Sequence, residues 1–268
     1  MSAVLLLKLF LVPLLILGVT MAGRRWGPAV AGWLSAFPIV AGPILLTLSL
    51  EQGAPFAAHA AHGTLLAVLA ILAFTLGYAW ASARFHVAGS MACALGAYGV
   101  ALAALQALHL DLLACLVLVI AALLLAPLLF PAPIAAAAPA KAGPSDVPWR
   151  MLAAAVLVLF VTYSASRLGA RLSGFLAMFP VMGTVLVGFS HQRSGRAFAV
   201  ALLRGTIYGY FAFATFCVLV SLLLQRQHTI AFAFSVALAC ALIVQLLVKV
   251  VLGLRQRNAA GAAPALGK

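Results

Sequence analysis

The chain has 268 residues, of which 66% are hydrophobic and only 7% are charged. A soluble globular domain needs far more polar surface, so this composition excludes that class and indicates a membrane protein. The formal net charge of +13 does not indicate a nucleic-acid partner. In so apolar a chain, basic residues anchor loops at the inner leaflet, and the partner that we expect is the lipid bilayer.

Long apolar runs follow one another along the whole chain, and each is long enough to cross a bilayer as a helix. We expect nine spans, at roughly 3–22, 28–50, 57–82, 87–107, 110–131, 149–166, 171–190, 197–224 and 229–253. The run 86–131 is broken only around "LHLD" and has the length of two helices, although one long helix or a re-entrant pair stays open. The fold class is therefore an all-α polytopic membrane protein.

The two halves of the chain repeat each other at a constant offset of 142 residues. "GWLSAFP" at 32–38 matches "GFLAMFP" at 174–180, and "HGT" at 62–64 matches "RGT" at 204–206. We therefore expect two four-helix units around one linking helix, a 4+1+4 arrangement. The corresponding segments are a first repeat (1–108), a linking helix (109–131), a Pro/Ala-rich linker (132–148), a second repeat (149–254) and a disordered tail (255–268). The counterpart of the first span lies inside the chain, so we do not expect that span to be a cleaved signal peptide.

An odd number of crossings separates corresponding helices, so the two repeats would be inverted relative to each other. An N-terminus outside and a C-terminus in the cytoplasm place most Lys and Arg residues on the inner side, as the positive-inside rule requires. If 86–131 were a single helix, the repeats would be parallel instead.

Each repeat carries a Phe-Pro pair about ten residues into its second span. Proline lacks an N–H, so Pro38 would leave the carbonyl of Leu34 without its helical partner, and Pro180 would do the same to Leu176. Broken helices at matching places of duplicated transporters mark a central site. The candidate substrate-binding residues here are Gly32, Phe37, Pro38, Gly174, Phe179 and Pro180. The alternative is a kink with close packing of small residues.

Basic residues also recur at the offset. His62 and Arg204 occupy matching places before Gly-Thr and complete the candidate substrate site. Three further pairs are candidate contacts to an anion or a lipid headgroup: Arg25 and Arg167, Arg84 and Arg226, and His86 and His228. The alternative for all of them is interfacial snorkelling.

Catalytic and metal-binding patterns are not found. The acids Glu51, Asp111 and Asp146 all lie outside the apolar interiors. The cysteines Cys93, Cys115, Cys217 and Cys240 lack the spacing of a metal or disulfide framework. We expect neither an enzyme nor a bound metal or cofactor.

The stretches "AGWLSAFPIVAGPILLTLSLEQG" and "SGFLAMFPVMGTVLVGFSHQRSG", followed by "FAAHAAHGT" and "FAVALLRGT", resemble the GlpM-like family. Its members are small bacterial inner-membrane proteins with four predicted helices and a Gly…Phe-Pro stretch in the second. The resemblance implies two such units fused through the linking helix, in the bacterial cytoplasmic (inner) membrane. It implies no substrate and no catalytic residue, and a homodimer stays open.

The pattern predicts a transporter or permease for a small polar, anionic or lipid-linked solute, with its site where the two Phe-Pro helices cross. Two alternatives stay open. One is a non-transporting scaffold, an accessory subunit of envelope polysaccharide or lipid synthesis. The other is a lipid flippase.

Overall fold

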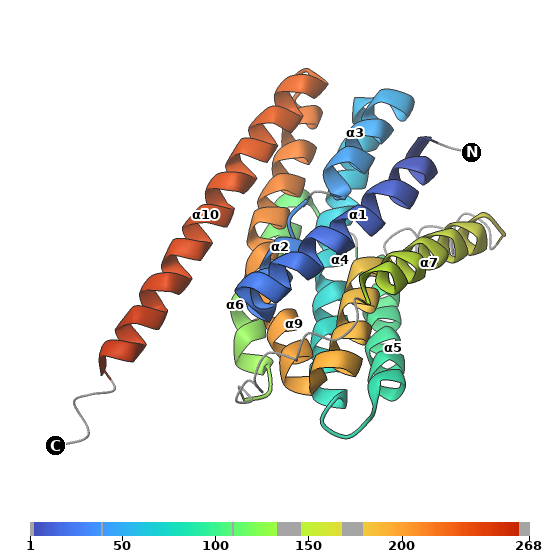
Figure 1. Cartoon of the computed structure of the whole chain (residues 1–268). Helices are drawn as coiled ribbons and strands as arrows, with labels where there is room; N and C mark the ends of the chain where they lie inside the picture. The colour runs from blue at the N-terminus through green and yellow to red at the C-terminus, as the bar shows by residue number, and fades with distance from the viewer. Residues whose placement is uncertain (1–2, 39, 109, 133–145, 168–178, 263–268) are drawn as a thin grey trace.

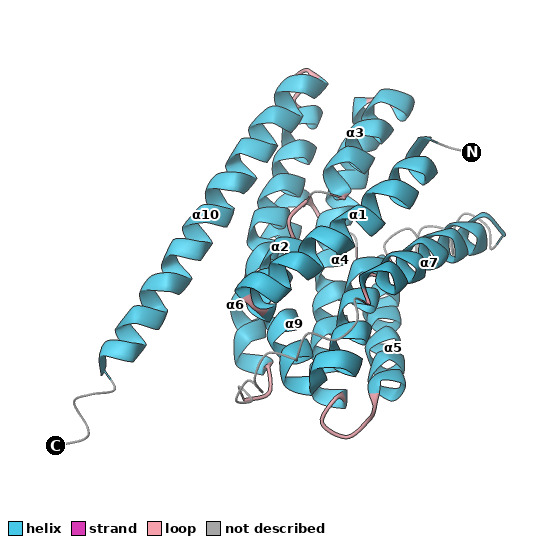
Figure 2. Cartoon of the chain, viewed as in Figure 1, coloured by secondary structure: helices cyan, strands magenta, loops and turns pink. Residues whose placement is uncertain are grey.

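The computed structural model describes residues 3–38, 40–108, 110–132, 146–167 and 179–262, and this part of the chain is built from helices (Figures 1 and 2). The helices are α1 (Ala3–Trp26), α2 (Pro28–Ser35), α3 (Ala41–Gln52), α4 (Ala54–Ala81), α5 (Val87–Gln106), α6 (Leu112–Leu129), α7 (Val147–Arg167), α9 (Val181–Gln225) and α10 (Ile230–Ala262).

Six of these helices are long and apolar enough to cross a membrane. These six helices are α1, α4, α5, α6, α9 and α10. Helix α7 contains a shorter apolar segment at Val147–Val161. A helix pairs its own backbone groups, which hydrocarbon demands of any segment that crosses it. The chain is thus a polytopic helical membrane protein.

The run 86–131 forms two helices, α5 and α6. The chain leaves α5 at Gln106, and α6 begins after Asp111, whose carboxylate accepts a 3.0 Å hydrogen bond from the amide of Ala114. A side-chain oxygen at the N-cap satisfies a backbone donor that would otherwise lack a partner, so the polar break is also the start of the next helix.

Helices α4 and α9 pack side by side in opposite directions at the centre of the molecule. Near one end of the pair, Ser221 of α9 donates to the carbonyl of Ala58 of α4 (2.9 Å). Near the other end, Arg196 of α9 donates from Nε to the hydroxyl of Ser82, just after α4 (3.2 Å). The first residues of α4 therefore contact the last residues of α9, and the end of α4 contacts the residues of α9 that follow Gly195.

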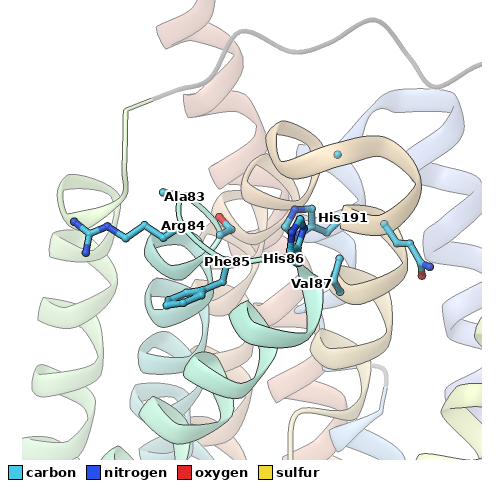
Figure 3. A pocket seen from close by; sticks show the side chains of 9 residues that line it. Ala83, Arg84, Phe85, His86, Val87 and His191 are labelled. Atoms are coloured by element: carbon cyan, nitrogen blue, oxygen red, sulfur yellow. The ribbon is translucent and has the colours of Figure 1, made fainter.

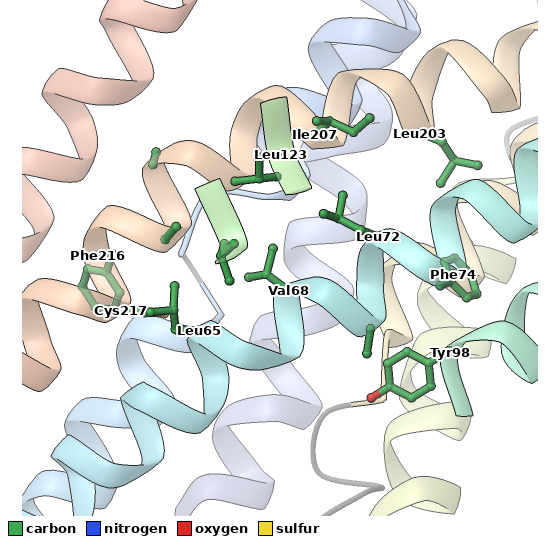
Figure 4. Packing of buried hydrophobic residues seen from close by; sticks show 14 of the residues in the cluster. Leu65, Val68, Leu72, Phe74, Tyr98, Leu123, Leu203, Ile207, Phe216 and Cys217 are labelled. Carbon is green, nitrogen blue, oxygen red and sulfur yellow. The ribbon is translucent and has the colours of Figure 1, made fainter. Parts of the chain in front are cut away.

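Buried aliphatic side chains fill the space between α4, α6 and α9. Figure 4 shows Leu65, Val68 and Leu72 of α4 facing Leu123 of α6 and Ile207 of α9, and all five are buried. Packing of this density supplies the van der Waals contact that holds helices together in lipid.

Both Phe-Pro pairs lie in non-helical bends. Helix α2 ends at Ser35 and α3 begins at Ala41, with Pro38 between them. Helix α9 begins directly after Pro180, whose φ of −77° and ψ of 63° place it at the centre of an inverse γ-turn. In that turn the amide of Val181 donates to the carbonyl of Phe179 (2.8 Å). Pro38 thus lies where helical hydrogen bonding ends, as its missing N–H predicts, and Pro180 immediately precedes a helix.

The carbonyl of Leu34 lacks its usual helical partner, as expected, because Pro38 has no N–H. It is still paired, because the amide of Phe37 donates to it at 3.2 Å. The last turn of α2 tightens, as helix ends often do, and this turn satisfies the carbonyl that the proline would have orphaned. Gly174 and Leu176 lie outside the described residues.

Two glycines outside the usual helical conformation separate consecutive helical segments. Gly53 (φ 88°, ψ 164°) stands between α3 and α4, and Gly195 (φ 80°, ψ 174°) kinks α9 into segments 181–194 and 196–225. Because Gly53 precedes α4 and Gly195 precedes the segment antiparallel to α4, the two glycines lie at opposite ends of the pair.

The ends of the chain add two further relationships. Helices α1 and α7 pack against each other, and Arg24 near the end of α1 pairs with Asp146 just before α7. Helix α10 crosses the outside of α9 and runs on to Ala262, so residues 255–262, for which disorder was expected, are helical (Figure 1).

Candidate functional site

Gly32 brings α2 directly against the backbone of α9. A Cβ at Gly32 would overlap the carbonyl oxygen of Leu202, and a Cβ at Gly205 of α9 would overlap the carbonyl of Ala29. Two helix backbones approach this closely only where side chains are missing. The position of Gly32 is therefore explained by helix packing, the alternative considered for it above.

The Phe-Pro bends place two helix N-termini inside the molecule. Helix α3 and the first segment of α9 begin with N-cap residues Val40 and Pro180, and neither N-terminus has a side-chain cap. At about 1.5 Å per residue, these two segments rise roughly 18 and 21 Å before they reach Gly53 and Gly195. Their first turns therefore lie about this far from Gly53 and Gly195, which are at opposite ends of the α4–α9 pair.

Aromatic rings pack around both bends. Phe179 makes an edge contact with Tyr98 (6.4 Å between ring centroids), while Phe37 is half-buried against the core. Phe74 of α4 lies beside Gly183, just after the second bend, and Phe216 of α9 lies beside Gly42, just after the first. Each long helix thus covers the start of the segment that belongs to the other half of the chain.

His62 and Arg204 are not brought together. His62 lies near the Ser221 end of the α4–α9 pair, and Arg204 lies near the Ser82 end. Counting about 1.5 Å per residue between the two end contacts, their levels differ by roughly 18 Å. Arg204 donates from Nη2 to the carbonyl of Pro131 (2.8 Å) and stacks over the Phe130 ring (5.5 Å). It thus binds the negative end of α6, where a cation is favoured.

The remaining basic candidates occupy two turns and one helix end. Arg84 and His86 lie in the turn between α4 and α5, whereas Arg226 and His228 lie in the turn between α9 and α10. All four are exposed, and the two turns are at opposite ends of the molecule. Arg25 is exposed and stacks on Trp26 (5.8 Å), as expected for an interfacial residue. The side chain of Arg167 lies outside the described residues.

An arginine cluster around Asp146 escaped the sequence analysis. The carboxylate pairs with Arg150 (2.7 Å), Arg24 (2.8 Å) and Arg193 (3.4 Å), which come from α7, α1 and α9. Partial burial alone would raise the pKa of Asp146, but the hydrogen bond and charge of Arg150, with the charge of Arg193, hold that pKa below its usual value. One carboxylate thereby joins three helices.

The same end of the molecule also holds Arg84 and Arg196, and we call it the Arg-rich end. Its one signal in the sequence was the density of arginine near the ends of spans. Nothing local showed that Arg24, Asp146 and Arg193 would meet, because 122 residues separate the first two.

A hollow of about 530 Å³ opens at the Arg-rich end. It is lined by Ser82, Ala83, Arg84, Phe85, His86, Val87, His191, Gln192 and Gly195. Figure 3 shows His86 and His191 together at its centre, while Arg84 extends away from them. Behind the hollow, the buried hydroxyl of Tyr78 is hydrogen bonded to Nδ1 of His191 (2.8 Å).

Comparisons with protein-family models, with curated proteins and with solved structures find no match to this chain.

Proposed function

We propose that this chain is an internally duplicated permease of the bacterial inner membrane that moves a small polar solute, anionic or lipid-linked, across the bilayer. Its units are two inverted four-helix repeats joined by α6, nine spans in all, related to the GlpM-like family. Its site lies at the Phe-Pro bends.

Corresponding helices pack on each other in opposite directions, which supports the inverted duplication. Helix α4 and the second segment of α9 differ by the 142-residue offset and are antiparallel, as are α1 and α7. Gly53 and Gly195 share both the offset and a positive φ. The contacts of Phe74 with Gly183 and of Phe216 with Gly42 are nearly reciprocal, as a two-fold relationship between the units requires.

The main support for a polar or anionic cargo is the pair of helix N-termini at the bends, which have no side-chain cap. Amide groups of the first helical turn carry a partial positive charge. Gly42 and Val181 already donate to the carbonyls of Pro38 and Phe179, and Pro43 has no N–H. The amides that remain for a ligand in the described part of the chain include those of Ala41 and Gly183. Two such ends that enter the bilayer from opposite sides provide donors for an anion where lipid provides none. A carboxylate or phosphate on the cargo would be held by backbone groups, so no acidic or basic side chain is required at the centre.

The charge distribution supports the orientation. In the described part of the chain, the Arg-rich end holds one acid, Asp146, and six arginines: Arg24, Arg25, Arg84, Arg150, Arg193 and Arg196. Glu51 lies at the other end beside Gly53. The positive-inside rule then places the Arg-rich end in the cytoplasm. Helix α1 ends there, so its N-terminus is outside, and the C-terminus of α10 is inside.

A second candidate is the non-transporting scaffold, and the filled core favours it. The side chains that line the α4–α6–α9 interface are buried, and the 530 Å³ hollow lies at an end of the molecule and not between Pro38 and Pro180. A scaffold needs no central path. In a permease this packing would represent a closed state.

Flux through proteoliposomes distinguishes the two candidates. The purified chain is reconstituted and screened with labelled inorganic and organic anions, and with fluorescent lipid-linked substrates to detect a flippase. For a transported solute, we expect Pro38→Ala and Pro180→Ala each to lower flux by about tenfold or more, since both alter the bends that position the amides.

Pro127→Ala is the matched control, because Pro127 lies inside α6, away from both bends. Its flux is expected to stay within about twofold of wild type, since alanine is an excellent helix former. A chain that moves none of these solutes would support the scaffold, and unchanged flux in both bend variants would refute the site.

A further inference from the structure

The hollow at the Arg-rich end combines several hydrogen-bond donors with positive charge. His86 and His191 line it, and Arg196 immediately follows Gly195 on its rim. Figure 3 shows His86 beside His191, and Arg196 is hydrogen bonded to Ser82, which also lines the hollow. Among the nine lining residues, none carries a carboxylate. A hollow with this lining attracts anions and repels cations.

A hydrogen bond to Tyr78 fixes the orientation of the His191 ring. Its Nδ1 is hydrogen bonded to the hydroxyl of Tyr78, a side chain with no exposed surface. This contact fixes the ring and leaves Nε2 as the nitrogen available to a ligand. When the Tyr78 hydroxyl donates to Nδ1, the neutral ring carries its proton on Nε2, and Nε2 is then a donor.

Arg196 is positioned in a similar way. Its Nε donates to the hydroxyl of Ser82, itself a lining residue. Within the described part of the chain, the terminal nitrogens of this guanidinium have no other partner. A guanidinium held by Nε presents its remaining donors as a fork that matches two oxygens of one anion.

The opposite end of the molecule provides a natural comparison. The turn at Arg226 and His228 repeats Arg84 and His86 at the 142-residue offset. At the same offset, however, Val220 stands for Tyr78, Ser49 for His191 and Ala54 for Arg196. Both ends of the molecule therefore have a basic turn, whereas His191 and Arg196 are present only at the Arg-rich end.

We propose that this hollow binds a phosphate group through His86, His191 and Arg196. A phosphate offers several acceptor oxygens at once, which suits a set of donors from the α4–α5 turn (His86) and from α9 (His191 and Arg196). At a membrane surface the phosphate belongs either to an anionic lipid headgroup or to a soluble phosphate compound. The proposal does not depend on transport, because a permease and a scaffold could each use such a site.

The test measures binding to the full chain in neutral detergent. One arm titrates radiolabelled inorganic phosphate, and the other counts retained phosphatidylglycerol against phosphatidylcholine by native mass spectrometry. We expect His191→Ala and Arg196→Gln each to weaken binding in at least one arm by about tenfold, the loss typical of one charged hydrogen bond. The exposed His86→Ala is a variant for which the fold is not at risk.

Arg226→Gln and His228→Ala are the matched controls, since they remove the corresponding charges at the other end. Both should leave binding within about twofold of wild type, because exposed and distant charges are screened. Loss confined to the phosphate arm identifies a soluble ligand, and loss confined to the lipid arm identifies a headgroup. An absence of binding in both arms, or equal losses in the controls, would overturn the proposal.

Discussion

Gly53 and Gly195 adopt the same backbone conformation at opposite ends of the antiparallel pair formed by α4 and α9. Their φ angles are 88° and 80°, with ψ at 164° and 174°. This region is open to glycine and strongly disfavoured for any residue with a Cβ. Each glycine lets the chain turn from one helical segment directly into the next without a loop.

Replacing either glycine by alanine should therefore destabilise the protein through its backbone. We expect Gly53→Ala and Gly195→Ala each to lower the free energy of unfolding by about 1–3 kcal/mol. Crowding is not the cause, since a Cβ at Gly195 would meet nothing within 4 Å. Denaturation in detergent micelles, followed by circular dichroism, measures the change. Gly99→Ala, at an open helical position, is the control, and equal stability of all three variants would contradict the assignment.

Gly63 and Gly205 stand at matching places in α4 and α9 but have opposite surroundings. A Cβ at Gly63 would meet nothing within 4 Å, whereas one at Gly205 would overlap the carbonyl of Ala29. We expect Gly63→Ala to raise stability by about 0.5–1 kcal/mol through helix propensity. Gly205→Ala should lower it by about 1–3 kcal/mol, because α2 must move away from α9. The same denaturation assay applies, and a shift of the same sign in both would disprove the close contact of α2 with α9.

The features that follow from local chemistry could be predicted from the sequence. The break between α2 and α3 at Pro38 could be foreseen because a missing N–H acts within one turn. The apolar runs gave membrane helices because hydrocarbon demands internally paired backbone. The satisfied carbonyl of Leu34 could not be foreseen, since helix ends choose among several ways of pairing their last groups.

Contacts between distant segments were harder to foresee. Asp146 looked like an isolated acid in a linker, and its three arginine partners come from three different helices. His191 had no counterpart in the repeat, so the repeat gave no signal for it. His191 can be recognised as part of the hollow only in the folded chain, where the kink at Gly195 brings it beside the turn that holds His86. Contacts between side chains that are far apart in the sequence produce no periodic pattern, so a single sequence does not predict them.

Asp146 should be a strong determinant of stability at the Arg-rich end. Its side chain is 14% exposed and that of Arg150 is 6% exposed. Replacing Asp146 by Asn leaves the nearly buried Arg150 without its counter-charge, a loss of roughly 3 kcal/mol. Asp111→Asn is the matched control, because Asn caps a helix about as well as Asp does. A D146N variant as stable as D111N at pH 7 would show that the cluster contributes little.

The same carboxylate gives a pH dependence with a defined sign. Because the folded pKa of Asp146 is lowered, its contribution is present above the unfolded value of about 3.9 and is lost as the pH falls through the folded value. Wild type should therefore lose its advantage over D146N as the medium is acidified from pH 5 towards pH 2. Unfolding curves at several pH values measure the difference, and a gap that stays constant over this range would contradict the assignment.

The opposite placement of Gly53 and Gly195 can be tested in the membrane itself. Gln52 and Gln192 are exposed and lie close to the two glycines. In a background without the four native cysteines, Gln52→Cys should react with a membrane-impermeant maleimide in spheroplasts, because the proposed orientation places that end outside. Gln192→Cys should react after the membrane is permeabilised and not before, since the proposed orientation places the Arg-rich end in the cytoplasm. Complete labelling of both variants after permeabilisation shows that each thiol is reachable. Labelling of both in intact spheroplasts, or of neither, would place the two glycines on one side of the bilayer and rule out an inverted pair of repeats.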